Sequence, residues 1–511
     1  MNLILYGPPG AGKSAVGREL AARLGREFMD SDALIESRAG LPIPQIFAER
    51  GEAGFRRIES EICGELAARQ SLVIALGGGA LLNPDNRAAL ERGGLIVCLR
   101  AEPAELLAHL RAEGHRPLLA GDNPEAKLTA LLDSRRALYD SFPEQIDASG
   151  KPIAQIADEV QSLLTPRSLS INAPGLQHKI LLGYDLLESL PALLAEHSLS
   201  GPAILVTDEN IALQFPIPNS QFPIAVLPAG ERHKTLDTIR HLYDVFLQNG
   251  LDRTGCVIAV GGGVIGDVTG FAAATFMRGV RWVNVPTTLL AMVDASLGGK
   301  TGVDLPQGKN LVGAFYPPAL VVSDLLALNT LPQAERTSGM AEVVKHGLIG
   351  DVALFESLER GAAFGSVQQM EQAIRVKIAV VEADPFERGQ RATLNLGHTI
   401  GHGVEAASGY RLRHGEAIAI GLCAEAHIAE EMGIAEHRLT ERIALLLMRI
   451  GLPTDCPGLD PAAIRAAMSS DKKKAGGKLK FSLPKRVGEV VWGLEVDEGR
   501  LTKVLNIITD R

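Results

Sequence analysis

LNLGHTIGHGVEAASGYRLRHGE, residues 394–416, places three of the twelve histidines of the chain within one short stretch. His398 and His402 are four residues apart and share one face of a predicted helix, and His414 follows a turn that contains glycine. Neutral imidazole is the commonest nitrogen ligand for a divalent metal, and an i, i+4 pair can direct two rings at one point. The stretch therefore predicts a metal site; the alternative is a polar helix cap with incidental histidines.

Length and composition limit the classes of protein that need considering. A chain of 511 residues, 46% of them apolar, is long enough for about three or four domains with separate cores. The net charge of −9 argues against nucleic acid or an anionic membrane as a general partner. Five cysteines without a CxxC pair indicate buried thiols in a reducing compartment. The chain starts in a strand-like segment, without a signal peptide or an apolar run that could span a membrane, so we expect a cytoplasmic protein.

The N-terminal residues 2–24 indicate a strand, a glycine-rich loop and a helix. GPPGAGKS, residues 7–14, matches GxxxxGK[ST] at every defined position. Gly10 and Gly12 let backbone N–H groups curl around phosphate, Lys13 would bridge the outer phosphates, and Ser14 would bind Mg²⁺. This segment predicts a nucleotide-binding site.

Four further segments supply residues for a phosphate acceptor. Asp30 and Asp32 end a predicted second strand on the same side, so one suits Mg²⁺ and the other suits accepting a hydroxyl proton. The alternative for this pair is an Asx turn or a helix cap. Arg56 suits a carboxylate, the glycines at 77–79 allow close approach of a small ligand, and Arg116 lies in a predicted mobile lid.

Residues 1–165 resemble shikimate kinase, on the ordered motifs P-loop, DSD, GEAGFR, GGG, RPLL and RALY. The resemblance implies a P-loop fold of the nucleoside-monophosphate-kinase type, with ATP, Mg²⁺ and shikimate. It places Asp30 at the metal and Asp32 at the shikimate hydroxyls, and Arg116 would act from the lid. The shikimate contacts would also include Arg56, Gly78, Gly79 and Arg135, and Arg111 is a further candidate for the nucleotide.

A second series of alternating strands and helices follows residues 166–175, which contain two prolines and are predicted to be an interdomain linker. Residues 203–210 indicate a strand that ends in polar groups able to reach a ribose. Further on, a buried strand, Gly261–Gly263 and a helix with Asp267 suit a pyrophosphate, although the GxGxxG order of the plain Rossmann motif is absent. This part predicts a dinucleotide site.

The next segment is rich in lysine and glycine. Lys300, Lys309 and Asn310 stand among glycines in a run that is too polar for core packing, so they line an anion pocket or a solvated loop. After residue 331, MAEVVKHG, EQAIRVKIAVVEAD and EAIAIGLCAEAHIAEEM show helical periodicity. The chain therefore changes from alternating strands and helices to a helical domain.

Residues 176–511 resemble 3-dehydroquinate synthase, on PAGERHKT, GGGVIGD, PTTLLAMVDASLGGKTGVD, KNLVGAFYPP, MAEVVKHG, LNLGHTIGH, HGE and DKK. The implied fold is a Rossmann-like α/β domain at 176–330 and a helical domain at 331–511, with the site in the cleft between them. The family pattern puts Glu342, His398 and His414 on the metal and turns His402 toward substrate phosphate, whereas helical spacing alone favours His398 with His402.

The resemblance also implies NAD⁺, Zn²⁺ with Co²⁺ as an alternative, and 3-deoxy-D-arabino-heptulosonate 7-phosphate as substrate; it leaves a homodimer through this half open. NAD⁺ would be bound by Asp208, Asn210, Glu231, Lys234, Gly261, Gly262, Gly263, Asp267, Thr287, Thr288 and Thr330, with Lys309 able to serve both ligands. The substrate would be surrounded by Arg278, Asp294, Lys300, Asn310, Lys345, Lys377, Arg391, Asn395, His402 and one of Lys472 and Lys473. Within that set, Asp294, Lys300, Lys345, Arg391 and His402 are the candidate catalytic residues.

Three other functions fit parts of the pattern. A related sugar-phosphate cyclase would act on a substrate without a carboxylate, which Arg391 and Lys377 argue against. A metal-dependent alcohol dehydrogenase would show net redox turnover. A non-catalytic fusion with one decayed half is disfavoured because the motifs of both halves are complete.

Overall fold

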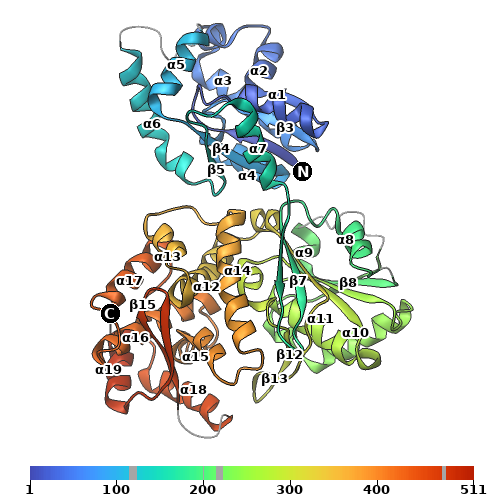
Figure 1. Cartoon of the computed structure of the whole chain (residues 1–511), viewed down its shortest axis with the longest axis vertical. Helices are drawn as coiled ribbons and strands as arrows, with labels where there is room; N and C mark the ends of the chain where they lie inside the picture. The colour runs from blue at the N-terminus through green and yellow to red at the C-terminus, as the bar shows by residue number, and fades with distance from the viewer. Residues whose placement is uncertain (114–122, 200, 215–221, 475–478, 511) are drawn as a thin grey trace. The chain divides into compact units, whose positions relative to one another are not determined.

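The computed structural model describes residues 1–113, 123–199, 201–214, 222–474 and 479–510, and the side chains of 112, 113, 214 and 469–474 are not described (Figure 1). The chain divides into two compact units. Unit 1 comprises Met1–Pro166 with the short segments Gly183–Asp185 and Ala362–Val367, and unit 2 comprises the remainder. Arg116, predicted to lie in a lid, falls outside the described residues.

Unit 1 is built on a five-stranded sheet in the order β2-β3-β1-β4-β5. Every neighbouring pair in it is parallel, so helical crossovers must connect the strands. The strands are β1 Asn2–Tyr6, β2 Glu27–Asp30, β3 Leu72–Ala75, β4 Gly94–Arg100 and β5 Gln145–Asp147. The helices are α1 Lys13–Leu24, α2 Ser31–Ala39, α3 Ile43–Ala67, η1 Ala80–Leu82, α4 Pro84–Gly93, α5 Pro103–Glu113, α6 Pro124–Asp140 and α7 Ile153–Leu163. The predicted strand, glycine loop and helix at the N-terminus are confirmed.

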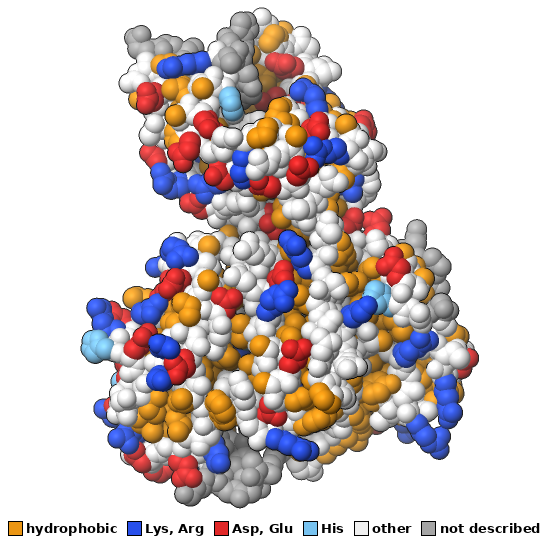
Figure 2. All heavy atoms as spheres, in the orientation of Figure 1, with side chains coloured by type: hydrophobic (Ala, Val, Ile, Leu, Met, Phe, Trp, Pro, Cys, Tyr) orange, Lys and Arg blue, Asp and Glu red, His pale blue; other side chains and the backbone are white. Residues whose placement is uncertain are grey.

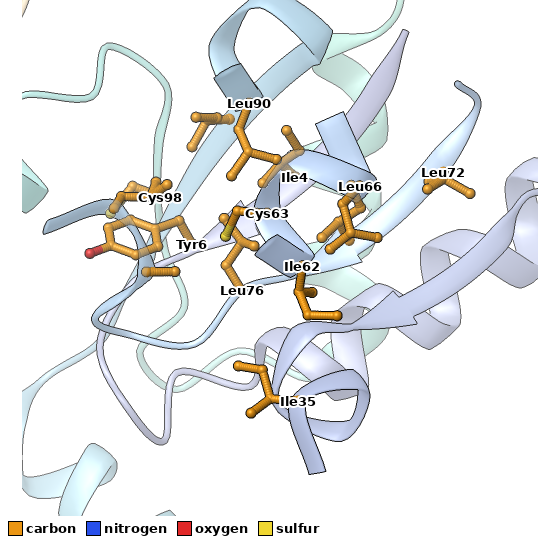
Figure 3. Packing of buried hydrophobic residues seen from close by; sticks show 14 of the residues in the cluster. Ile4, Tyr6, Ile35, Ile62, Cys63, Leu66, Leu72, Leu76, Leu90 and Cys98 are labelled. Atoms are coloured by element: carbon orange, nitrogen blue, oxygen red, sulfur yellow. The ribbon is translucent and has the colours of Figure 1, made fainter. Parts of the chain in front are cut away.

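One hydrophobic cluster holds α3 on the sheet of unit 1. Ile4 and Tyr6 from β1 meet Ile62 and Cys63 from α3, and all four side chains are at most 2% exposed (Figure 3). Burial of this size is worth about 1.5–3 kcal/mol for each large apolar side chain. The cluster fixes β1, and β1 leads directly into the glycine-rich loop.

Unit 2 contains a seven-stranded sheet in the order β6-β7-β14-β11-β10-β8-β9, together with two separate hairpins. The sheet strands are β6 Arg167–Ile171, β7 His178–Gly183, β8 Ala203–Asp208, β9 Ile224–Leu227, β10 Cys256–Gly261, β11 Arg281–Pro286 and β14 Leu320–Asp324. The hairpins are β12 Lys300–Leu305 with β13 Gly308–Phe315, and β15 Phe481–Arg486 with β16 Glu489–Leu494. Parallel pairing of β9, β8, β10, β11 and β14 confirms the α/β class of this part.

The helices of unit 2 fall into two groups along the chain. Those interleaved with the sheet strands are α8 Leu190–Glu196, α9 Glu209–Gln214, η3 Glu231–His233, α10 Leu236–Gln248, α11 Gly263–Thr275, η4 Phe276–Arg278, η5 Ala291–Ala295 and η6 Leu325–Asn329. Those that follow are α12 Gln333–Gly350, α13 Val352–Glu359, α14 Val367–Ala383, η7 Gln390–Asn395, α15 His398–Ala407, α16 His414–Glu431, α17 Leu439–Ile450, α18 Pro461–Lys474 and α19 Glu498–Thr509. The second group confirms the predicted helical part, and Figure 1 shows its later members gathered around β15.

The predicted linker at 166–175 needs correcting. Residues Arg167–Ile171 form β6, an edge strand that pairs antiparallel with β7. Leu169 and Ile171 are buried, whereas Arg167 and Ser168 are exposed. This short alternation of apolar and polar residues is a strand pattern that five residues make hard to recognise.

The surface carries charges of both signs. Figure 2 shows lysine, arginine, aspartate and glutamate side chains interspersed over the visible face of unit 2. Among the described residues, no helix is both long enough and apolar enough to span a bilayer.

Candidate active sites

The glycine-rich loop of unit 1 is shaped for an anion. Gly10 and Gly12 have φ of 82° and 79°, and a Cβ at Gly10 would lie 2.8 Å from the carbonyl oxygen of Leu106. Helix α1 begins without a side-chain cap, so its first N–H groups are directed at the loop. The Nζ of Lys13 is buried and donates to the carbonyl oxygens of Gly7 and Pro8, both at 2.9 Å. These features are those of a phosphate cradle.

Asp30 contacts Ser14 and also caps a helix, the alternative that the sequence left open for this carboxylate. Its Oδ2 accepts a hydrogen bond of 2.6 Å from the Ser14 hydroxyl, so the two predicted magnesium ligands are in contact. Its Oδ1 accepts the N–H of Asp32 at 3.1 Å and thereby caps α2. The prediction that both carboxylates end the strand was wrong, because β2 stops at Asp30 and Asp32 lies in the first turn of α2.

The predicted shikimate residues of unit 1 converge on the glycines that follow β3. Arg135 donates from Nη1 to the carbonyl oxygen of Gly78 at 2.7 Å. A Cβ at Gly79 would lie 2.7 Å from Nη1 of Arg56, and one at Gly77 would lie 2.5 Å from Oδ1 of Asp32. Two cations and one carboxylate therefore surround a turn without side chains, which suits a small hydroxy acid.

Two residues of unit 1 escaped the sequence analysis. Glu59 is 3% exposed and accepts from Nη1 of Arg56 at 2.7 Å; burial raises its pKa, against the opposing effect of Arg56. His109 on α5 contacts the carbonyl oxygen of Gly10 at 2.9 Å through Nδ1. The sequence could have indicated Glu59, because it follows Arg56 by three residues on one predicted helix. No sequence pattern indicated His109. The candidate Arg111 is exposed on the same helix α5.

Several of the predicted dinucleotide residues of unit 2 lie at the carboxyl ends of β8, β10 and β11. Gly261 ends β10 and Gly263 begins α11, as predicted. Asp208 caps α9 by accepting the N–H of Ile211 at 3.1 Å, and the buried hydroxyl of Thr287 has no hydrogen-bond partner among the described residues. The remaining candidates are Asn210 in the first turn of α9, Gly262 before α11, Thr288 after β11 and Thr330 after η6.

A buried lysine joins residues that the sequence had divided between cofactor and substrate. The Nζ of Lys234 contacts Oδ2 of Asp267 at 2.6 Å and Oδ1 of Asn310 at 2.5 Å. Glu231 lies 4.0 Å from the same Nζ and 3.9 Å from Nζ of Lys309. Burial raises the pKa of Asp267, and Lys234 opposes this shift. The four charged groups and Asn310 form one polar cluster beside α11.

The metal-type cluster draws on three helices. Ligand atoms of Glu342 on α12, His398 on α15 and His414 on α16 all lie within 4.8 Å of one another. Oε1 of Glu342 is 3.6 Å from Nε2 of each of the two histidines. Backbones approach closely there, since a Cβ at Gly415 would lie 1.8 Å from the carbonyl oxygen of Ser338 on α12. This set agrees with the family-implied ligands.

The chemistry of this cluster fits a bound cation. Glu342 is fully buried, and neither of its carboxylate oxygens has a hydrogen-bond partner among the described residues, although Lys345 forms a close ion pair with it. Burial opposes ionisation, yet Lys345 and the two histidines hold the pKa of Glu342 well below its usual range. Burial holds the pKa of His398 well below its usual range. A buried carboxylate with two imidazoles beside it is a donor set for a divalent metal.

His402 stands beside the cluster. Its ring centroid is 5.1 Å from that of His398 and 5.9 Å from that of His414, so the predicted shared helix face is confirmed. His402 is exposed and forms a second possible group with His414 and Glu405. Nδ1 of His414 lies 3.3 Å from Oε2 of Glu405, whose other oxygen binds Nζ of Lys309 at 2.9 Å. The sequence analysis did not identify Glu405.

The predicted substrate residues around Asp294 are largely brought together. Lys377 donates to Oδ1 of Asp294 at 2.6 Å, and Lys345 donates to the carbonyl oxygen of Leu394 at 2.9 Å. Arg391 is 2% exposed and donates to the carbonyl oxygens of Pro385, at 2.5 Å, and Gly298, at 3.4 Å. All three cations are buried in unit 2, and Lys345 forms a close ion pair with Glu342 of the metal-type cluster.

Other candidates are placed differently. Lys300 is exposed and paired with Glu387 at 2.7 Å. Arg278 is exposed at a φ of 68°, and Asn395 is exposed at the end of η7. Lys472 lies on α18, but its side chain is outside the described part of the chain.

Two buried groups of unit 2 also escaped the sequence analysis. Neither ring nitrogen of the fully buried His346 has a hydrogen-bond partner among the described residues, and Nε2 lies 3.9 Å from Oδ1 of Asp294. Glu425, on α16, is fully buried, and burial raises its pKa to about 8 against the opposing effect of backbone N–H groups. Both residues stand in helix segments that are buried on almost every side, so no polar face marked them in the sequence.

Three family models match the chain. Shikimate kinase matches residues 9–165, 3-dehydroquinate synthase N-terminal matches 224–338, and 3-dehydroquinate synthase C-terminal matches 339–474. A 3-dehydroquinate synthase of Symbiobacterium thermophilum is 45% identical over 351 residues, which cover 62% of this chain and 97% of that protein. One of Nostoc punctiforme is 43% identical over 356 residues, covering 66% and 98%.

Two solved structures share the fold of the second part. A 2-deoxy-scyllo-inosose synthase complexed with carbaglucose-6-phosphate, NAD⁺ and Co²⁺ is 29% identical, with a TM-score of 0.60, covering 67% of this chain and 99% of that one. The 2-epi-5-epi-valiolone synthase of Streptomyces hygroscopicus, with NAD⁺ and Zn²⁺ bound, is 27% identical, with a TM-score of 0.59, covering 65% and 96%.

Fold and residue clusters define the class: an enzyme in two parts, a P-loop kinase unit followed by an α/β unit with a helical extension. The chain belongs to the 3-dehydroquinate synthase family and carries a shikimate kinase domain ahead of the synthase. Both resemblances inferred from the motifs are confirmed, and both families belong to the shikimate pathway.

Proposed function

We propose that one chain catalyses two reactions. Residues 1–165 would transfer phosphate from ATP to shikimate, yielding shikimate 3-phosphate. Residues 176–330 and 331–511 would together convert 3-deoxy-D-arabino-heptulosonate 7-phosphate to 3-dehydroquinate and phosphate. The observation that carries the synthase proposal is the buried Glu342 with His398 and His414, set beside an interior lined by Lys345 and Arg391.

In the kinase site, Gly10, Gly12 and Lys13 would hold the phosphates of ATP, and Ser14 with Asp30 would hold Mg²⁺. The metal would neutralise charge on the phosphates. Asp32 faces the glycine turn after β3, where it can accept the proton of the shikimate hydroxyl that attacks. Arg56 and Arg135 converge on the same turn and suit the carboxylate of shikimate.

In the synthase site, Glu342, His398 and His414 would hold Zn²⁺ or Co²⁺, and the residues at the carboxyl ends of β8, β10 and β11 would hold NAD⁺. When bound, the metal polarises a carbinol oxygen and the dinucleotide accepts and returns a hydride. Arg391 offers a buried charge for the substrate carboxylate. Burial raises the pKa of Asp294, but the charges of Lys377 and Lys345 lower it by more. Asp294 therefore stays ionised beside Lys377.

The test is an assay of both reactions on the purified full chain. Shikimate should be phosphorylated in the presence of ATP and Mg²⁺, and the heptulosonate phosphate should release phosphate without net accumulation of NADH. Net NADH would instead indicate a dehydrogenase. Equal turnover of a sugar phosphate without the carboxylate would indicate a different cyclase and would contradict the role given to Arg391.

A further inference from the structure

Glu425 is a buried acid for which the proposed reaction has no use. It lies in α16, three turns after His414, and it is fully buried. Within the part of the chain that the structure describes, no lysine, arginine or histidine forms an ion pair with it. Leaving a carboxyl group in a core without a cationic partner is costly, so its contacts with the backbone must offset that cost.

Those contacts are all at the start of α15. Oε2 of Glu425 accepts the N–H of Gly397 at 2.6 Å, and Oε1 accepts the N–H of Ile400 at 3.2 Å. Gly397, the residue before α15, has φ of 78° and no side chain to cap the helix. The first N–H groups of a helix have no partner within it, and a side-chain acceptor normally precedes it. Here the acceptor is supplied by a different helix.

Close packing makes this reach possible. A Cβ at Gly421 would lie 1.9 Å from the carbonyl oxygen of Gly397, so α15 and α16 touch through their backbones. The carboxyl group of Glu425, one turn further along α16, then lies directly against the first turn of α15.

The first residue of α15 is His398. Its Nε2 is 3.6 Å from Oε1 of Glu342, and its Nδ1 is 3.1 Å from the carbonyl oxygen of Leu396. Glu425 therefore binds the backbone before and after His398, at Gly397 and at Ile400. Helix α16 thus carries one histidine of the cluster, His414, and its Glu425 holds the backbone of the other, His398.

We propose that Glu425 is a positioning residue, which fixes the entry of α15 so that His398 is directed at the metal site of the proposed synthase. This inference rests on the proposed function, because it concerns the same Glu342, His398 and His414. Glu425 itself does not touch the reacting atoms.

The experiment compares Co²⁺ binding to the metal-free full chain for the parent, Glu425→Gln and Glu425→Ala. Gln keeps the size and one acceptor oxygen, whereas Ala removes both. Affinity, read from the visible absorption of bound Co²⁺, should fall in the order parent, Gln, Ala, with a loss of about 10- to 100-fold for Ala, as for other residues that orient a metal ligand. Glu425→Gln also tests the proposal if the Ala variant does not fold.

The matched control is Ile428→Val, a core truncation one turn further along α16 at a fully buried residue. It should melt at a lower temperature than the parent and keep the parent Co²⁺ affinity, and shikimate phosphorylation should be unchanged in every variant. Unaltered Co²⁺ affinity in both Glu425 variants would overturn the positioning role. An equal loss in Ile428→Val would reduce Glu425 to a general packing residue and would overturn it as well. Failure of the parent chain to bind Co²⁺ would instead contradict the proposed metal site.

Discussion

Replacing Arg391 by alanine should disable the synthase without affecting cofactor binding. Arg391 is 2% exposed, and the two described acceptors of its guanidinium are the backbone carbonyl oxygens of Pro385 and Gly298. No carboxylate forms an ion pair with it in the described part of the chain. Burial lowers its pKa, although Glu387, Asp294 and Asp384 act in the opposite direction. A buried cation with no paired carboxylate leaves its charge available for an anionic substrate.

The size of the effect follows from this burial. Removing one partner of a buried, hydrogen-bonded charge pair costs about 2–5 kcal/mol. Since tenfold in rate corresponds to about 1.4 kcal/mol, kcat/KM should fall by about 30- to 4,000-fold. The near-complete burial of Arg391 favours the upper part of this range, so we expect at least about 100-fold. Loss of the bonds to the two carbonyl oxygens should cost about 1 kcal/mol each in stability.

The assay follows phosphate release from the heptulosonate phosphate and, separately, NAD⁺ affinity by calorimetry. Arg388→Ala is the matched control, because Arg388 lies three residues before Arg391, just ahead of η7, and is exposed. It should retain parent kinetics, and shikimate phosphorylation by the same preparations serves as the internal standard. Equal losses of NAD⁺ affinity and of kcat/KM in Arg391→Ala would refute the reasoning, since they would assign Arg391 to the cofactor site or to the fold.

Three further predictions concern the metal, the kinase and pH. Exhaustive chelation should abolish phosphate release from the heptulosonate phosphate, and Zn²⁺ or Co²⁺ should restore it; full turnover by a chain shown to be metal-free would contradict the Glu342 site. Asp32→Asn should slow shikimate phosphorylation by about 100-fold or more, since the amide cannot accept the proton, and synthase turnover should not change. A synthase rate that falls in step, in a chain that melts like the parent, would show that the two units are coupled. Burial lowers the pKa of His178 to about 4, so the folded state binds fewer protons than the unfolded state between about pH 6.5 and 4. Stability is complete above this window and should fall by about 3 kcal/mol as the pH drops through it. His178→Leu should flatten this dependence in urea titrations followed by the fluorescence of Trp282 and Trp492, both in unit 2, and an unchanged slope would rule out His178 as its source.

The amino-acid sequence by itself determined the features that depend on contiguous residues. Gly10, Gly12 and Lys13 predict the phosphate loop because the backbone conformation and the anion contacts both come from one short segment. His398 and His402 predict a shared helix face because the period of a helix is a local property. Motif order along the chain was enough to indicate both families.

Tertiary structure decided what depends on which distant residues meet. Glu342 joins His398 and His414 only because α12, α15 and α16 pack with their backbones in contact, and no spacing in the sequence encodes that approach. The hydrogen bond from the N–H of Gly397 to Glu425 could not be predicted from the sequence for the same reason. A buried glutamate within an apolar helix has no local pattern that names its partner. Residues 167–171 became a strand only through pairing with β7, because five residues of weak alternation acquire strand structure from a neighbour and not from their own propensity.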